Sequence, residues 1–145
     1  MYFGRVDEWR WQLLRELDDP LWLAYPAEHD QYATDERFHV LRHRLGAEDW
    51  KWADGGGADR DTGWPHASYV GRITVPGAVL TVSNFAPLVG VSGDPGPEVE
   101  ELDELGWVLI PEEPLWRSYD GSNRTLFQLG LRNPTWWTRF FDNLY

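Results

Sequence analysis

Three residues with metal-binding side chains recur at helical spacing in the first third of the chain. Glu36, His39 and His43 stand at steps of three and four, so a helix would place them on one face. Neutral imidazoles and carboxylates bind zinc. The residue after His39 is Val40, however, so the His-Glu-x-x-His motif of zinc proteases is absent. A solvated helix face explains the pattern more simply, and we predict neither a metal site nor a cofactor.

A serine in a glycine-rich turn is the second candidate for chemistry. Ser92 lies in the run Gly90-Val91-Ser92-Gly93-Asp94, where Asp94 replaces the second glycine of the Gly-x-Ser-x-Gly nucleophile elbow. A Pro-rich turn follows the serine, and all four histidines precede it, against the Ser, acid, His order of α/β-hydrolases. We therefore predict no catalytic residue at this position.

Carboxylates beside aromatic rings offer a third kind of chemistry. Glycoside hydrolysis needs two acids at a set separation next to the sugar ring, and Glu112 and Glu113 lie between Trp107 and Trp116 in the sequence. With 24 acidic residues in the chain, such a combination has low specificity. It supports an alternative hypothesis: a small-molecule or carbohydrate-binding protein, or an enzyme, with a Trp-lined pocket that bears carboxylates.

The strongest charge signal is an acidic helix predicted to begin at Pro97 and end at Gly106. Its narrow apolar stripe is Val99, Leu102 and Leu105, and no basic residue occurs between Arg72 and Arg117. Acids near the C-terminal end of a helix oppose the helix dipole, so helix stability alone does not explain them. Docking of a cationic partner would explain these acids. The competing interpretation is that they form a solvated helix face.

Composition agrees with a cationic partner. The chain of 145 residues fits a single domain over 1–145, and its 24 acidic against 13 basic residues give a net charge of −11. This charge disfavours nucleic acid and anionic membranes, and it attracts basic proteins. The chain has no cysteine, no apolar run of membrane-spanning length, and an acidic start without signal-peptide features. We therefore predict a cytoplasmic location.

The chain has ten tryptophans, and a domain of this size cannot easily bury that many large side chains in its core. Some of them are therefore expected at a functional surface. We predict a mobile, acidic, Gly-rich loop over 53–66 as a second acidic patch. The predicted partner-binding residues are Glu98, Glu100, Glu101, Asp103 and Glu104 on the acidic helix, Asp54, Asp59, Asp61 and Trp64 on the loop, and Trp107 and Trp116.

The elements that must position these residues follow from hydrophobic periodicity. We expect helices over 5–18 and from Asn133 and Pro134 onward, and a helix rather than a strand over 35–45, capped by Thr34 or Asp35. Strands are expected at 72–75, 79–82, 88–91, 107–110 and 125–131. The turn at Pro76-Gly77 is expected to be wider than two residues, because Pro-Gly favours a type II turn.

This order predicts an α+β fold: a mainly antiparallel sheet of about four to five strands, with the helices at both chain ends packed on one side. The leading functional hypothesis is a small acidic interaction protein, an immunity-type inhibitor that neutralises a basic partner such as a nuclease-like toxin. A further alternative is a subunit of a larger assembly that uses its C-terminal aromatic residues as an interface.

Overall fold

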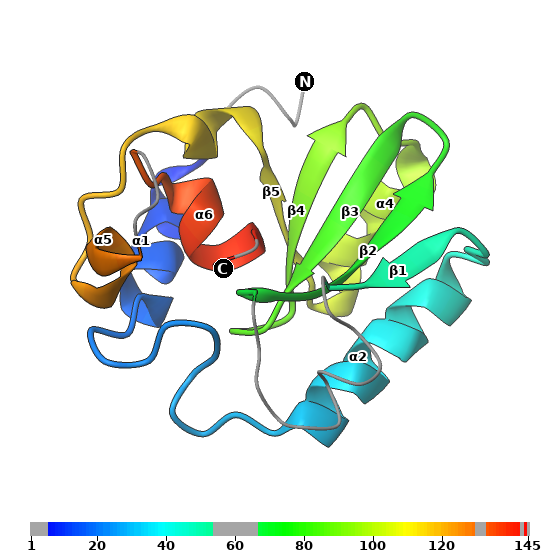
Figure 1. Cartoon of the computed structure of the whole chain (residues 1–145). Coiled ribbons are helices and arrows are strands. Elements are labelled where there is room, and N and C mark those ends of the chain that lie inside the picture. The colour runs from blue at the N-terminus through cyan, green and yellow to red at the C-terminus, as the bar shows by residue number, and fades with distance from the viewer. Residues whose placement is uncertain (1–5, 54–66, 130–132, 143, 145) are drawn as a thin grey trace.

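The computed structural model describes residues 6–53, 67–129, 133–142 and 144 (Figure 1). Within these residues, five strands form one sheet in the order β1-β2-β3-β4-β5. They are β1 (Trp50–Trp52), β2 (Tyr69–Val75), β3 (Ala78–Ser83), β4 (Leu88–Gly93) and β5 (Val108–Pro111). The pairs β1–β2, β2–β3 and β3–β4 are antiparallel, and β5 pairs with β4 in parallel. The α+β prediction is confirmed.

Helices cover both faces of the sheet. The terminal helices α1 (Glu8–Leu17) and α6 (Trp136–Phe141) share one core cluster, which confirms that the two chain ends pack on one side. The helix α2 (Gln31–Arg44) packs into a second cluster with α4 (Pro97–Glu100) and the 3-10 helix η2 (Glu101–Leu105). Successive side chains of a strand point to opposite faces of the sheet, so the two clusters lie on opposite faces.

Strand β4 shows this alternation most clearly. Leu88 belongs to the cluster of the terminal helices, while Val89 and Val91 belong to the cluster of α2 and η2. Gly90 also faces the terminal helices, because a Cβ built on it would lie 2.6 Å from the Trp137 ring. The glycine therefore lets α6 approach the sheet closely.

Four local predictions need correction. Helix α2 begins at Gln31, because Asp30 caps it by accepting a hydrogen bond from the Ala33 amide; neither Thr34 nor Asp35 is the cap. Helix α6 begins after Thr135, which forms a capping box with Thr138, whereas Asn133 adopts a positive φ of 54°. The strand expected over 125–131 is instead the short helix α5 (Thr125–Gln128). The Pro76-Gly77 turn has only two residues, since Val75 pairs with Ala78.

Strand β1 was not predicted. It has only three residues, too few to show a period in the sequence, and it forms because Trp50 and Trp52 pair with Ile73 and Gly71 of β2. The predicted loop over 53–66 lies outside the described residues from position 54 on. No helix in the described part of the chain combines the length and apolarity needed to cross a membrane.

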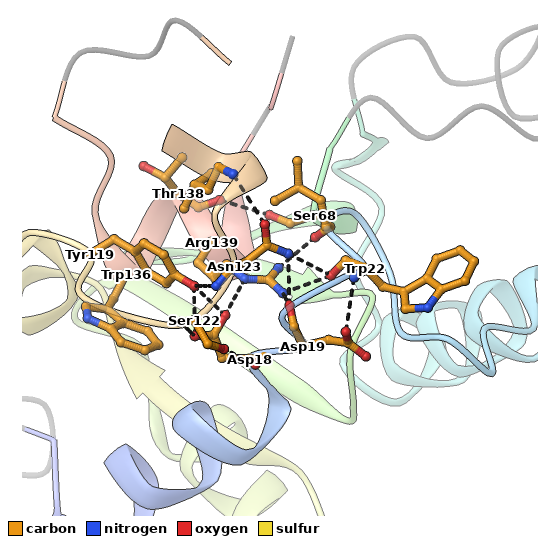
Figure 2. Close-up of polar contacts among 12 residues, drawn as sticks. Asp18, Asp19, Trp22, Ser68, Tyr119, Ser122, Asn123, Trp136, Thr138 and Arg139 are labelled. Carbon is orange, nitrogen blue, oxygen red and sulfur yellow. Dashed lines mark hydrogen bonds and ion pairs between the residues drawn. The ribbon is translucent and has the colours of Figure 1, made fainter. Parts of the chain in front are cut away.

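A buried polar network joins the segment after α1 to the C-terminal helix (Figure 2). Arg139, fully buried on α6, donates through Nε to the carboxylate of Asp18 at 2.7 Å. Its terminal nitrogens donate to the carbonyl oxygens of Leu23, Asp19 and Trp22 at 2.7–3.1 Å. The irregular segment thereby obtains hydrogen-bond partners that a helix or strand would otherwise supply.

Tyr119 and Asn123 complete this network from a different part of the chain. The Tyr119 hydroxyl donates to Asp18 at 2.7 Å and accepts from the Asn123 amide at 2.7 Å. Burial and the hydrogen bond to Asp18 raise the pKa of Tyr119 well above its usual value. The Asn123 side-chain amide donates to the carbonyl oxygens of Asp19 and Trp22. These polar groups form hydrogen bonds with one another, so we interpret the network as structural.

Candidate functional site

A shallow apolar groove lies between α2 and the turn that connects η2 to β5. Its volume is about 540 Å³. One wall is Tyr32, Glu36 and Val40, which stand four residues apart along α2 and therefore share one line on the helix surface. Arg37 of the same helix also lines the groove, and the other wall is Leu105 and Trp107.

The groove contains apolar side chains that the core leaves in contact with solvent. Tyr32 is 79%, Val40 57% and Leu105 48% exposed. Along α2, Phe38 and Leu41 are buried against the sheet, so the line through Tyr32 and Val40 remains largely exposed to solvent. Three large exposed apolar residues around one groove indicate an interaction site rather than scattered surface positions.

The acidic helix leads directly into this groove. Its stripe divides there: Val99 and Leu102 are buried, whereas Leu105 lies on the groove wall. Gly106 then adopts a positive φ of 95°, ends η2 and turns the chain toward Trp107. The predicted start at Pro97 and end at Gly106 are therefore confirmed.

The five predicted acids of this helix lie on its outside. Glu98, Glu100, Glu101, Asp103 and Glu104 are all exposed. Arg10 of α1 reaches Asp103 at 3.5 Å, and it also pairs with Asp7 at 2.7 Å. No other ion pair to these five acids occurs in the described part of the chain. The helix therefore presents a concentrated negative surface beside an apolar groove.

The predicted partner-binding residues do not form one continuous surface. Trp107 and Trp116 stand beyond opposite ends of β5, so the strand separates them, and only Trp107 lines the groove. Asp54, Asp59, Asp61 and Trp64 lie outside the described residues. The structure therefore brings together the acidic helix and Trp107, and it adds the α2 wall that sequence reasoning missed.

A smaller hollow of about 300 Å³ lies at the carboxyl ends of the parallel strands β4 and β5. Glu112 lines it, and Ser92 Oγ donates a hydrogen bond to one of its carboxylate oxygens while Trp116 Nε1 donates to the other at 3.0 Å. Trp116, on the 3-10 helix η3 (Glu113–Trp116), remains 58% exposed. The hollow thus combines a fixed carboxylate with an indole ring that is accessible for stacking.

The residues considered above as metal ligands and as an assembly interface do not form a site in the fold. Glu36 lines the groove, whereas the His39 ring packs edge-on against Trp50 and Trp52 at centroid distances of 5.6 and 5.1 Å. Among the described residues, no group of three or more His, Asp or Glu side chains is arranged to hold a metal ion. The C-terminal aromatics Trp136, Trp137, Phe140 and Phe141 are buried within this chain, so they offer no exposed assembly face.

A scan against protein-family models and searches of curated proteins and of solved structures each found no match. Function therefore has to be inferred from the chemistry of the chain's own residues.

The groove's α2 wall had a signal in the sequence that was not used. Tyr32, Glu36 and Val40 are spaced for one helix face, but the predicted helix began at 35 and so excluded Tyr32. Recognising Asp30 as the cap would have extended the helix far enough to include it. The exposure of Leu105 had no local signal, because Leu105 continues the same apolar stripe as the buried residues Val99 and Leu102.

Proposed function

We propose that this protein binds a basic protein through the groove between α2 and η2, and neutralises it as an immunity-type inhibitor does. The observation that supports the proposal is the continuity of the acidic helix with the groove. Long-range attraction by the acids speeds encounter, and apolar anchors in a groove supply short-range affinity.

The groove and its surroundings define the chemistry of the partner segment. Tyr32, Val40 and Leu105 suit one or two apolar anchor side chains. Glu36 and Arg37 both line the α2 wall, so their charges offset each other, and Glu104 beside Leu105 suits a Lys or Arg residue flanking those anchors. A basic segment with embedded apolar residues, on the surface of a cationic protein, meets both requirements. In this proposal both proteins act in the cytosol.

The test compares capture of partners from source-cell lysate by three forms of the tagged protein. The first is the wild type, the second carries Glu100→Lys and Glu101→Lys, and the third carries Glu8→Lys and Glu16→Lys. The last pair makes the same change in net charge on the exposed face of α1. We expect one basic protein to be captured by the wild type and by the α1 variant, and to be released at high salt, because salt screens exposed charges.

For the purified pair, reversal at Glu100 and Glu101 should slow association by roughly tenfold or more at low salt. Leu105→Asp should speed dissociation, because it places a charge in an apolar contact. Equal capture by the two charge variants would refute a role for the acidic helix. A captured partner that is acidic, or is indifferent to salt, would refute the proposal as a whole.

The hollow at Glu112 supports a second candidate function, the binding of a sugar or another small polyol. Trp116 supplies a stacking ring, and Glu112 supplies a positioned acceptor. Titration with neutral monosaccharides and disaccharides, followed by tryptophan fluorescence, tests this candidate. A saturable change should be lost in Trp116→Ala and kept in Trp9→Ala, which removes another exposed tryptophan. No saturable change in the wild type would exclude this class of ligand.

A further inference from the structure

The groove between α2 and η2 restricts the backbone conformation of a segment that binds in it. Of the described residues that line the groove, none belongs to a strand. The amides of Gly106 and Trp107 donate to carbonyl oxygens of η2, and the Pro87 carbonyl accepts from the Val108 amide. The α2 backbone forms its hydrogen bonds within its own helix. An extended segment in the groove therefore has no strand edge to pair with.

A helical segment does not need such an edge, because it pairs its own backbone groups. Backbone N–H and C=O groups that leave water require hydrogen-bond partners, and an α-helix supplies them internally. The exposed line on α2 also has a suitable length. Tyr32 and Val40 stand eight positions apart on α2, which separates them by about 12 Å along the helix axis. About two turns of a second helix span the same distance.

The η2 side of the groove carries negative charge next to its apolar residue. Side chains three residues apart in a 3-10 helix lie in one row, so Glu101 and Glu104 form a row beside Leu105. Both acids are exposed. Asp103 belongs to a different row, which faces α1, because Arg10 approaches its carboxylate at 3.5 Å. Glu101 and Glu104 are therefore the acids of η2 that lie away from α1 and can contact a segment in the groove.

The α2 side of the groove offers no comparable negative charge. Glu36 and Arg37 both line this side, so their charges offset each other. Arg44 stands four residues after Val40 and continues the same line on the helix surface. A lysine or arginine on this side of a bound helix would lie close to Arg37 or Arg44, and like charges in an interface are unfavourable. The two sides together favour a helix whose basic residues lie on one flank.

We propose that the segment that fills the groove is an amphipathic α-helix with basic residues on one flank only. Its apolar stripe contacts Tyr32, Val40 and Leu105, and its basic flank faces Glu101 and Glu104. The flank that faces α2 is uncharged. This inference rests on the proposed function, because it specifies the part of a basic protein that the groove binds.

The test uses synthetic peptides as probes, so no natural partner is needed. The helical peptide has leucines at alternating three- and four-residue steps, lysines along one flank and alanines elsewhere. The proline peptide replaces one central alanine by proline, which breaks the helix and keeps the charge and the leucines. Fluorescence anisotropy measures affinity, and the NMR chemical shifts of a labelled peptide report its bound conformation. We expect the helical peptide to bind saturably as a helix, and the proline peptide to bind roughly tenfold or more weakly.

A variant of the groove wall tests where the helical peptide binds. Leu105→Asn should weaken binding by roughly tenfold, because a polar amide replaces an apolar contact. Leu105 is half exposed, so the variant should fold, and its melting temperature checks this. The matched control is Leu21→Asn, which makes the same change at an exposed leucine outside the groove. The control should bind the peptide as tightly as the wild type.

The one-sided charge is tested on both molecules. Glu101→Gln with Glu104→Gln should weaken binding of the helical peptide by roughly fivefold, since each exposed ion pair contributes little. Glu8→Gln with Glu16→Gln makes the same change in net charge on α1 and should leave binding unchanged. A third peptide carries lysines on both flanks. It should bind no more tightly than the helical peptide, although general attraction to an acidic protein would favour it.

Several results would overturn the proposal. Equal binding of the helical and proline peptides would show that the groove does not select a helix, and it would leave the proposed function standing. Tighter binding of the peptide with lysines on both flanks would contradict the one-sided charge. Absence of saturable binding, or binding that Leu105→Asn leaves unchanged, would show that the groove does not take such a segment. Failure of the lysate experiment while the helical peptide still binds in the groove would instead reject the inhibitor role alone.

Discussion

Replacing Arg139 tests the buried network that holds the two ends of the chain together. The side chain is completely buried and makes four hydrogen bonds, one to the carboxylate of Asp18 and three to backbone carbonyls. Arg139→Met fills much of the same volume but makes none of these bonds. We expect it to weaken the fold strongly while leaving the surface of the protein unchanged.

The size of the effect follows from which partners remain. Asp18 keeps the hydrogen bonds from Tyr119 and Ser122, but it loses its cation. The carbonyl of Leu23 loses the donor that the structure gives it. Removing one partner of a buried ion pair costs about 3–5 kcal/mol. Since a domain is stable by about 5–15 kcal/mol, the variant should lose about a fifth or more of its free energy of unfolding.

Urea unfolding measures this loss, followed by tryptophan fluorescence and by far-ultraviolet circular dichroism. Arg44→Met, an exposed arginine on α2, is the matched control and should change the free energy of unfolding by no more than about 0.5 kcal/mol. The double variant Asp18→Asn with Arg139→Met should be more stable than the sum of the two single losses predicts, because no unpaired charge remains. A loss under about 1 kcal/mol for Arg139→Met, or strict additivity in the double variant, would refute this account of the network.

Three further predictions concern packing, capping and pH. Gly90→Ala should cost about 1–3 kcal/mol, because its new Cβ meets the Trp137 ring; thermal unfolding measures this, and an unchanged melting temperature would contradict it. Thr135→Ala should cost about 0.5–2 kcal/mol in urea unfolding by removing the cap of α6, and a smaller loss would mean that the capping box contributes little. The raised pKa of Tyr119 keeps its hydroxyl protonated in the folded protein, whereas the hydroxyl ionises near pH 10 in the unfolded chain. The contribution of this hydroxyl to the free energy of unfolding is therefore present below about pH 10, and above about pH 10 it falls by about 1.4 kcal/mol per pH unit. Urea titrations between pH 9 and 11 should show that slope reduced in Tyr119→Phe but not in Tyr32→Phe, an exposed control, and equal slopes would refute the assignment.

Elements with strong local signals were predictable. The acidic helix begins at Pro97 and ends at Gly106 as expected, since proline at the first position and a glycine with positive φ are local properties. The strands at 72–75, 79–82, 88–91 and 107–110 also lie within or next to the observed strands. Their branched, alternating residues suit a sheet wherever it packs.

Elements that depend on distant partners were missed or assigned wrongly. Residues 125–128 resemble a strand by composition, but Asn123 Oδ1 accepts a hydrogen bond from the Leu126 amide and starts a helical turn. The position of Asn123 is set in turn by carbonyls about a hundred residues earlier. No local pattern reports such a contact.

The candidate site was predictable in charge but not in shape. The sequence places five acids around a three-residue stripe, and that surface is present. Which member of the stripe stays exposed is a tertiary property: Leu102 is buried in the core cluster of α2 and the sheet, whereas Leu105 is not part of that cluster.

The long reach of the Arg139 network has a consequence for the order of folding. Asp18 and Arg139 are 121 positions apart, and Asp18 and Tyr119 are 101 apart. Closing loops of this length is entropically costly, and contacts of such separation slow folding. The sheet, built mainly from neighbouring hairpins, can assemble first. The segment after α1 has to wait for α6 before its carbonyls are paired, so during synthesis this early part of the chain stays open until the last helix arrives.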